Sequence, residues 1–134
     1  MRIALSAWAG QISPVFDSAE HVVFLDIQGE KTLYQINATL QSNSPIERIA
    51  ELKAFGTDTL ICGAVSRALA ELVRGSGIRV ISFVSGDVGT VLDAFLNGTL
   101  PSPELTMPGC WKRRERRRRH GRPVPAGRDA SPKK

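Results

Sequence analysis

Among residues 1–110, the side chains that can bind a soft metal are Cys62, Cys110 and His21. Thiolate and imidazole groups suit iron, zinc or copper(I). The three lie far apart in the sequence and follow no ligand-spacing motif, so the pattern alone is a weak indication of a metal site. Cys62 also fits a small residue buried at a strand end, and His21 fits a surface residue at a strand start. The sequence leaves both interpretations open for each.

Cys110 stands directly before a run of basic residues. Neighbouring cations favour the thiolate, which makes a cysteine more reactive and a better metal ligand. A linker cysteine without a role is the competing interpretation. If a metal cluster is bound, Cys110 is the first candidate ligand, followed by Cys62 and His21.

The turn from Gly63 to Ser66 offers a second kind of site. It follows a predicted strand and opens a predicted helix, so its free N–H groups and the helix dipole can hold an anion such as a cluster or an organic acid. The phosphate-binding Gly-x-x-x-x-Gly-Lys pattern is absent. A plain strand-to-helix turn explains the same residues.

Catalytic groups are not spaced as an enzyme would need. His21 is the only imidazole in residues 1–110, and no carboxylate is spaced to orient it as a base for a serine. The first predicted strand carries no acid that could hold a nuclease metal. We therefore expect a non-enzymatic protein.

The first part of the chain predicts three strands, at residues 3–7, 21–27 and 32–38. Residues 8–14 read as a loop because they contain Ala9-Gly10 and Ser13-Pro14. The link between the second and third strands is short, which predicts an antiparallel hairpin.

The hydrophobic period changes at Ser44. Ser44, Pro45 and Glu47 predict a capped helix that ends at Gly56, with Ile46 on its apolar face. Two more strands and two more helices follow: a strand at 59–62, a helix capped by Ser66 with Leu72 facing inward, a strand at 78–83, and a helix from Asp87 to Asn97-Gly98. The order β-β-β-α-β-α-β-α predicts an α/β fold, a five-stranded mixed sheet with three helices.

This layout also predicts where a ligand binds. In an open α/β sheet, ligands collect at the carboxyl ends of the parallel strands. That edge carries the segments 8–16, 62–66 and 85–87, and an antiparallel second strand begins there with His21. We expect Cys62 and His21 to share this edge.

Charge divides the 134-residue chain. Residues 1–110 hold seven Lys and Arg against eleven Asp and Glu, 7 − 11 = −4, whereas residues 111–134 hold eleven against two, 11 − 2 = +9. We expect a domain at 1–100, a linker at 101–110 and a disordered Arg-rich tail at 111–134. The tail suits nucleic acid, an acidic protein or an anionic membrane surface, or is simply a solvated extension. Two cysteines, no signal peptide and no long apolar run predict a cytoplasmic protein without a transmembrane segment.

Short motifs carry a family resemblance over residues 1–100. The segment Ile12-Ser13-Pro14-Val15-Phe16-Asp17-Ser18-Ala19, the segment Cys62-Gly63-Ala64-Val65-Ser66-Arg67 and the segment Gly77-Ile78-Arg79-Val80-Ile81 resemble the dinitrogenase iron–molybdenum cofactor biosynthesis domain family. The resemblance implies a ribonuclease H-like fold and a role as carrier or accessory domain for metal clusters. Many members carry a His before the Phe of the first loop, where this chain has Val15.

The resemblance favours a non-enzymatic binding or carrier protein for an iron–sulfur or iron–molybdenum cluster, with a cluster donor or acceptor protein as partner. One alternative is a regulatory module whose basic tail binds nucleic acid or an acidic protein. The other is a small-anion binding domain that uses the sheet edge.

Overall fold

The computed structural model describes residues 1–29 and 31–110. The predicted tail at 111–134 lies outside the described residues. Within the described part of the chain, no helix has the length and apolar character needed to cross a membrane.

Three strands pair antiparallel, as the alternating pattern predicts. They are β1 (Arg2–Trp8), β3 (His21–Gln28) and β4 (Lys31–Thr39). Leu5 lies opposite Val23, and Val23 lies opposite Asn37. The β3–β4 hairpin is confirmed, and Gly29 supplies the positive φ of 61° in its turn.

Two short strands extend the sheet on the other side of β1. β5 (Thr59–Ile61) runs parallel to β1, and β6 (Arg79–Ile81) runs parallel to β5. The strand order is therefore β4-β3-β1-β5-β6. The mixed sheet and its parallel, helix-linked strands are confirmed.

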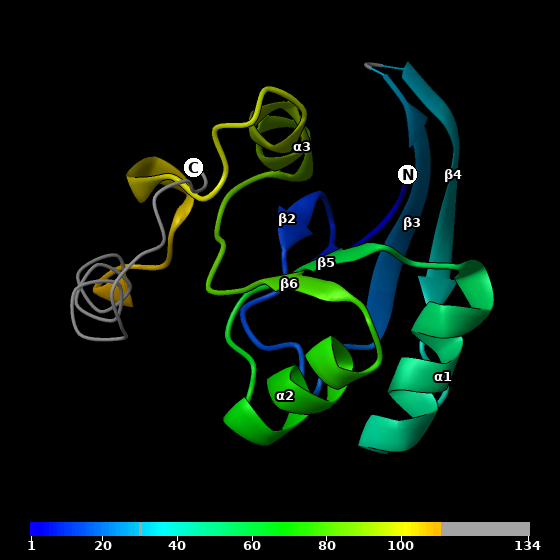
Figure 1. Cartoon of the computed structure of the whole chain (residues 1–134). Coiled ribbons are helices and arrows are strands. Elements are labelled where there is room, and N and C mark those ends of the chain that lie inside the picture. Colours follow the sequence, from blue (N-terminus) through cyan, green and yellow to red (C-terminus); the bar gives the residue numbers. More distant parts are fainter. Residues whose placement is uncertain (30, 111–134) are drawn as a thin grey trace, which may run out of the picture.

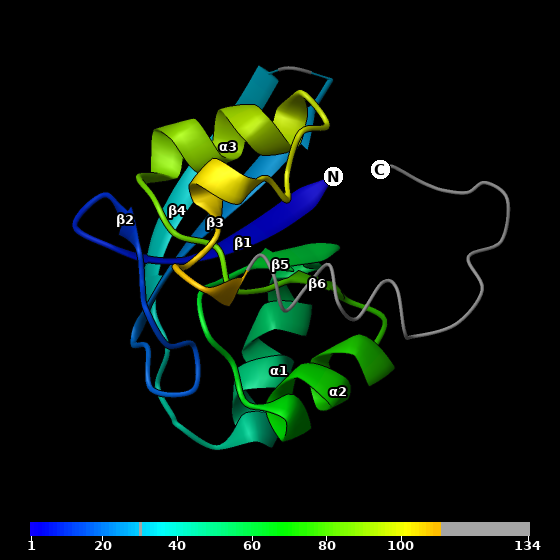
Figure 2. The same ribbon diagram turned by 90° about the vertical axis from the view of Figure 1, so that its left-hand side faces the viewer.

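Helices cover both faces of the sheet (Figures 1 and 2). α1 (Pro45–Phe55) and α2 (Arg67–Gly75) lie on one face, and α3 (Val88–Leu96) lies on the other. Each face has its own apolar cluster: Leu52, Leu60 and Val73 belong to the first, and Leu5, Ile61 and Val91 to the second. The α/β class with three helices is confirmed.

The sheet formed by the described residues has six strands, one more than expected. β2 (Gln11–Ile12) pairs antiparallel with the end of β1, in a part of the chain predicted to be a loop. Ala9 and Gly10 connect the two strands with φ angles of 55° and 82°. Two consecutive positive φ angles define a type I′ hairpin turn. The sequence does not predict this turn, because alanine rarely adopts a positive φ.

All three helices start where the sequence predicts, but only two of the three capping side chains form a hydrogen bond with the helix N-terminus. Ser66 accepts a hydrogen bond from the Leu69 N–H. Asp87 accepts hydrogen bonds from the Thr90 hydroxyl and N–H, which lower the pKa of the Asp87 carboxyl. Ser44 occupies the expected capping position, but its hydroxyl makes no capping hydrogen bond.

The inward faces of α1 and α2 differ from the prediction. Ile46 is 75% exposed, whereas Arg48 of the same helix is 1% exposed. Leu72, expected to face inward on α2, is 49% exposed. Arg48 takes the inward position because the loop beneath α1 presents carbonyl groups that a guanidinium can satisfy.

The segment 101–110, expected to be a linker, is bonded to the domain. It contains η1 (Pro103–Leu105), and Thr106 is buried. The Ser85 N–H donates to the Leu105 carbonyl, and the Met107 N–H donates to the Phe83 carbonyl. These contacts make the segment part of the packed structure.

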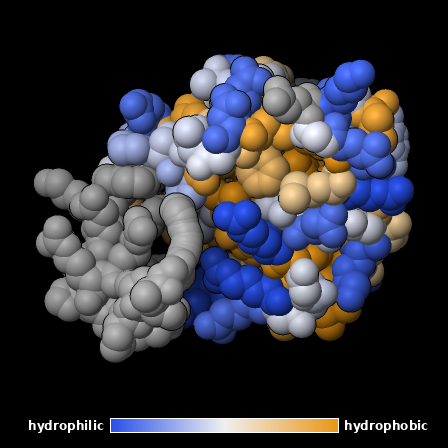
Figure 3. All heavy atoms as spheres, turned by 45° about the horizontal axis from the view of Figure 1, so that its top comes forward, coloured by the Kyte–Doolittle hydropathy of each residue, from blue (hydrophilic) through white to orange (hydrophobic). Residues whose placement is uncertain are grey.

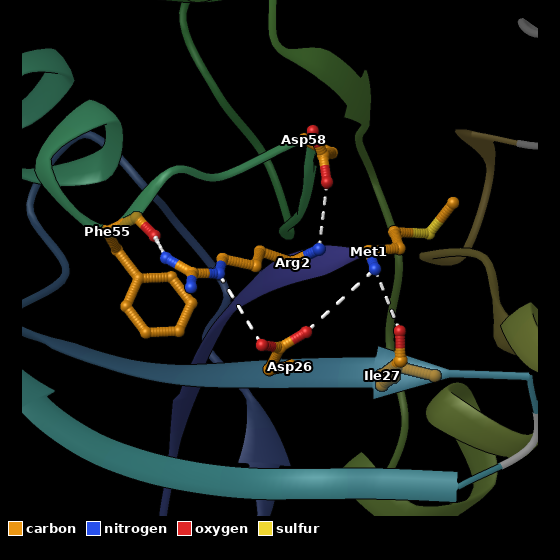
Figure 4. A network of polar contacts seen from close by, with 6 residues as sticks. All are labelled: Met1, Arg2, Asp26, Ile27, Phe55 and Asp58. Atoms are coloured by element: carbon orange, nitrogen blue, oxygen red, sulfur yellow. Dashed lines mark hydrogen bonds and ion pairs between the residues drawn. The ribbon is translucent and has the colours of Figure 1, made fainter.

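A polar network joins the first residues to two other elements (Figure 4). The Met1 ammonium donates to the Ile27 carbonyl at 2.8 Å, and the Arg2 guanidinium donates to the Phe55 carbonyl at 2.6 Å. Asp26 forms ion pairs with both residues, at 3.9 and 3.6 Å. The network lies at the edge of the sheet opposite the candidate site and ties the start of β1 to β3 and α1.

Candidate functional site at the carboxyl edge of the sheet

The predicted edge exists, and backbone hydrogen bonds hold its segments together. The Phe16 N–H donates to the Ala64 carbonyl, and the Ala64 N–H donates to the Pro14 carbonyl, both at 2.7 Å. The Ile12 N–H donates to the Gly86 carbonyl at 3.0 Å. The first loop is therefore fixed against the turns that follow β5 and β6.

Gly63 is required by this close approach. A Cβ at Gly63 would collide with the carbonyl oxygens of Ser13 and Pro14. The packing of the first loop against the 63–66 turn thus explains a glycine that the sequence suggested as an anion-binding residue.

A cavity of about 400 Å³ opens at this edge, on the face that carries α3. We call it the Trp8 cavity. It is lined by residues 7–10 of the β1–β2 hairpin, 21–23 of β3, Gln35 and 37–39 of β4, and Val88 of α3. Its volume falls within the range of small-molecule sites. Seen from the α3 side, apolar surface lies exposed between hydrophilic groups (Figure 3).

Trp8 and His21 form the most distinctive pair at the cavity. Their rings stack with centroids 4.0 Å apart and an interplanar angle of 18°. Trp8 is nonetheless 64% exposed, so one large aromatic surface faces solvent at the cavity mouth. Exposed tryptophan on a well-ordered hairpin is typical of binding sites, because the ring offers a large contact area at little entropic cost.

The other polar groups of the cavity come from β4. Gln35, Asn37 and Thr39 alternate along the strand and therefore lie on one face of the sheet. The Gln35 amide donates weakly to Asn37, at 3.4 Å. Among the residues that the structure describes, no Asp, Glu, Lys or Arg lines the cavity, and His21 is the one titratable side chain there. The wall offers amide, hydroxyl and imidazole groups for hydrogen bonds to a ligand that brings its own charge.

Cys62 does not join His21 at the cavity. Its side chain is fully buried on the α1 and α2 face, in one cluster with Leu60 and Leu69. His21 lies on the opposite face, in alternation with Val23 and Leu25. Burial raises the pKa of the Cys62 thiol to about 12, so it stays protonated near neutral pH. A protonated, buried thiol is a poor metal ligand.

Cys110 also lies away from His21. It is half-buried, and its N–H donates to the Met107 carbonyl in the segment bonded to the turn after β6. In the sheet order, β3 and β6 are three positions apart, which corresponds to about 14 Å between strands. Within residues 1–29 and 31–110, no group of three or more His, Cys, Asp or Glu side chains is close enough to hold a metal ion.

At the anion-binding position expected at Ser66, a carboxylate of the chain itself takes the place of an external anion. The Asp17 carboxylate accepts a hydrogen bond from the Ser66 N–H at 2.7 Å. The Ala64 N–H is bonded to the Pro14 carbonyl. Two of the N–H groups that could hold an external anion are therefore already bonded.

Arg48 is a residue that sequence reasoning missed. Its guanidinium donates to the carbonyls of Phe16 and Ala19, at 3.1 and 2.6 Å, and to the Asn43 side chain at 2.9 Å. It also lies over the Phe16 ring, 5.4 Å from the centroid. Burial lowers the pKa of this guanidinium, while the carboxylates of Asp17, Glu51 and Glu20 raise it. One feature of the sequence does indicate that Arg48 faces inward. It precedes the buried Leu52 by four residues, and residues four apart lie on the same face of a helix.

Comparisons with protein families and with solved structures show the family and the fold of this chain. The sequence matches the family model described as dinitrogenase iron-molybdenum cofactor over residues 1–98. The chain belongs to this family.

Two solved structures show the same fold. The crystal structure of PH0822 is 24% identical, with a TM-score of 0.72, and the match covers 84% of this chain and 98% of that one. The apo form of the orange protein from Desulfovibrio gigas is 22% identical, with a TM-score of 0.63, and the match covers 78% of this chain and 94% of that one. A search of curated proteins gives no match to the sequence.

Proposed function

We propose that this chain is a non-enzymatic binding or carrier protein for a metal cluster of the kind handled in iron–molybdenum cofactor biosynthesis. The family match over residues 1–98 is the observation that carries the proposal. We assign the cargo to the cavity at the carboxyl edge, whose volume of about 400 Å³ supports this assignment. The ribonuclease H-like classification belongs to the same proposal, supported by the antiparallel strand β3 beside β1 in a sheet whose helix-linked strands are parallel.

The cargo is an anionic iron–sulfur or iron–molybdenum cluster in this proposal. His21, Gln35 and Asn37 supply imidazole and amide N–H donors, and Trp8 supplies an apolar cover. Hydrogen bonds to an anion are stronger than those between neutral groups, which favours such a cargo over a neutral one. His21 also provides an imidazole at the edge, where the first loop has Val15 in place of histidine.

Cys110 is the second candidate ligand. It is not buried as Cys62 is, and it lies on the segment that packs beside the turn after β6. A thiolate there would hold a cluster outside the Trp8 cavity. The partner in either case is a protein that donates or accepts the cluster.

Anaerobic reconstitution with iron and sulfide, with and without molybdate, tests the proposal. Metal analysis and absorption spectroscopy of the full chain should show bound cluster. His21→Ala should reduce the cluster content if the Trp8 cavity holds it, and Cys110→Ser should reduce it if the thiolate does. Cys62→Ala is the matched control, because the buried thiol should make no difference to loading. Absence of metal in the wild-type chain under all these conditions would contradict the proposal.

The charge of residues 111–134 supports a second candidate function, binding to a polyanion. The stretch carries +9 while residues 1–110 carry −4. Replacing the arginines at 113, 114 and 116–119 with glutamine should abolish retention of the full chain on heparin. Retention should weaken as salt rises, because each neutralised phosphate-like charge releases counterions. Arg67→Gln and Arg79→Gln in the domain form the matched control. Retention that survives the loss of the arginines would contradict this function.

A further inference from the structure

Among the residues that the structure describes, the His21 ring has no hydrogen-bond or ion-pair partner at either nitrogen. Histidines that bind metals usually donate their second ring N–H to a carboxylate or a backbone carbonyl, which fixes the orientation of the ring. Since no such partner occurs in the described part of the chain, another contact has to orient His21 if its imidazole is to serve as a ligand.

The contact that can orient this ring is the stack with Trp8. The two ring centroids lie 4.0 Å apart, and the ring planes differ by 18°. An imidazole carries its nitrogens in the plane of the ring, so a neighbour on one face leaves both of them open to a ligand. The stack therefore restricts the tilt of the His21 ring without covering the atoms that would bind.

Trp8 can hold another ring because two backbone hydrogen bonds fix its own position. It ends β1, and the β1–β2 hairpin that follows is bonded to the segment at the start of α3. The Val88 N–H donates to the Gly10 carbonyl at 2.8 Å, and the Ile12 N–H donates to the Gly86 carbonyl at 3.0 Å. The hairpin is thus a fixed support for an indole ring that is itself 64% exposed.

We infer that Trp8 is a positioning residue, which acts through His21 by holding the imidazole in the orientation that binds the cargo. The inference rests on the proposed function, because it assigns the ring nitrogens of His21 to the metal cluster. Without the stack, His21 would sample about three χ1 wells and about two ring orientations. Only a fraction of these states presents the nitrogens to the cavity, so loss of the stack should weaken binding about three- to sixfold.

Proton NMR of the full chain tests the stack without any cargo. A His120→Gln background leaves His21 as the only histidine, so its ring signals are assigned directly. Protons over the face of an indole are shielded. The His21 ring protons should therefore resonate upfield in this background and return to ordinary positions when Trp8→Ala is added. Trp8→Phe keeps an aromatic face and should keep part of the shift.

Cluster loading at limiting iron tests the functional consequence. With iron and sulfide supplied anaerobically below saturation, Trp8→Ala should bind about three- to sixfold less cluster than the wild-type chain. Trp8→Leu keeps an apolar side chain but offers no ring, so it should lose as much. Trp8→Phe should recover most of the loading, because a phenyl ring also stacks on imidazole.

The matched control for the loss of an aromatic ring is Tyr34→Ala. Tyr34 is 37% exposed on β4 and does not line the Trp8 cavity, so its removal should leave cluster loading unchanged. Circular dichroism checks that each variant is folded. Wild-type loading of Trp8→Leu would show that Trp8 is only an apolar cover, and it would overturn the inference even if Trp8→Ala does not fold.

A His21→Ala background separates positioning from direct contact with the cargo. A residue that acts only through His21 has nothing to position once the imidazole is gone. Trp8→Ala should then lower the loading by less than about twofold further. The same three- to sixfold loss in both backgrounds would mean that Trp8 contacts the cargo by itself, and it would overturn the inference.

The two measurements distinguish a failure of this inference from a failure of the proposed function. His21 ring protons that do not move on Trp8→Ala would show that the stack is absent and overturn the inference, whether or not the chain binds a cluster. Upfield ring protons in a wild-type chain that takes up no cluster would uphold the positioning of His21 by Trp8 and contradict the proposed function alone.

Discussion

The Asp17 carboxylate accepts a hydrogen bond from the Ser66 backbone N–H at 2.7 Å, at the N-terminus of α2. A helix N-terminus otherwise presents unpaired N–H groups and the positive end of the helix dipole. The first loop brings Asp17 to this place, and Arg48 fixes that loop through the Phe16 and Ala19 carbonyls. An external anion would have to displace the chain's own carboxylate, which is why our proposed function assigns the anionic cargo to the Trp8 cavity and not to this helix N-terminus.

Replacing Asp17 should weaken the joint between the first loop and α2. Asp17→Ala removes both the hydrogen bond and the charge at the helix dipole, and we expect the free energy of unfolding to fall by about 1 kcal/mol. Asp17→Asn keeps an acceptor and should lose less. Asp93→Ala, at an exposed position of α3, serves as control. Thermal unfolding at low salt measures the stability of these variants. Equal effects of Asp17→Ala and Asp93→Ala would show that Asp17 does not stabilise the contact between the first loop and α2.

Arg48 should matter far more to stability than a surface arginine does. Arg48→Ala leaves the buried Ala19 carbonyl without its donor and removes one of the two donors to the Phe16 carbonyl, so we expect a loss of about 2–4 kcal/mol in the free energy of unfolding. Arg48→Lys should recover only part of it, because an ammonium cannot reproduce the forked geometry.

The control for Arg48 is Arg67→Ala on α2. The Arg67 side chain is 92% exposed and forms an ion pair with Glu71 at 3.7 Å. An exposed pair of this kind contributes little, so the control should change stability by less than about 0.5 kcal/mol. Urea denaturation compares the variants at equal m-value. A similar small loss for both arginines would show that the guanidinium of Arg48 does not hold the loop.

Local patterns predicted the elements of this fold, whereas side-chain placement depended on contacts that no local pattern encodes. The short β3–β4 connection and the caps at Ser66 and Asp87 depend on neighbouring residues, so they were readable from the sequence. The hairpin at Ala9-Gly10 was missed because its first residue is strained. The inward face of α1 was misjudged because loop carbonyls, and not apolar side chains, lie beneath Arg48.

The segments predicted to meet at the carboxyl edge of the sheet do meet there, but Cys62 does not lie beside His21. The carboxyl edge follows from topology, so the first loop and the turns after β5 and β6 meet as expected. Cys62 and His21 point to opposite faces, which depends on the register of each strand. The ring stack of Trp8 on His21 joins the hairpin turn to the start of β3, and spacing in the sequence gave no sign of it.

Ala9 should become more stable as glycine. Its φ of 55° strains an alanine by about 1–2 kcal/mol, and glycine adopts the same angle freely. The greater entropy of glycine in the unfolded chain offsets part of this gain, so Ala9→Gly should raise the free energy of unfolding by about 0.5–1 kcal/mol. Ala50→Gly, at an exposed position inside α1, should lower it by about 0.5–1 kcal/mol. Urea denaturation measures the change in the free energy of unfolding for both variants. A lower free energy of unfolding for Ala9→Gly would contradict the type I′ turn.

The two described cysteines should differ in reactivity. Burial of Cys62 keeps its thiol protonated, whereas Cys110 is half-buried near the surface. A thiol reagent such as DTNB should therefore modify one cysteine of the folded wild-type chain quickly at neutral pH. Cys110→Ser should remove this fast reaction, and Cys62→Ala should leave it unchanged. Fast labelling of the Cys110→Ser variant without denaturant would contradict the burial of Cys62.

The same thiol should make stability depend on pH in the alkaline range. The pKa of Cys62 rises from an ordinary value of 9.0 to about 12 in the folded chain, because burial disfavours the thiolate. The unfolded chain therefore releases this proton before the folded chain does. The stabilisation is fully present below about pH 9 and is lost as the pH rises toward 12. Cys62→Ala lacks this titration, so the difference in free energy of unfolding between wild type and variant should shrink from about pH 8 to about pH 11. A difference that stays constant over that range would show that Cys62 ionises alike in both states.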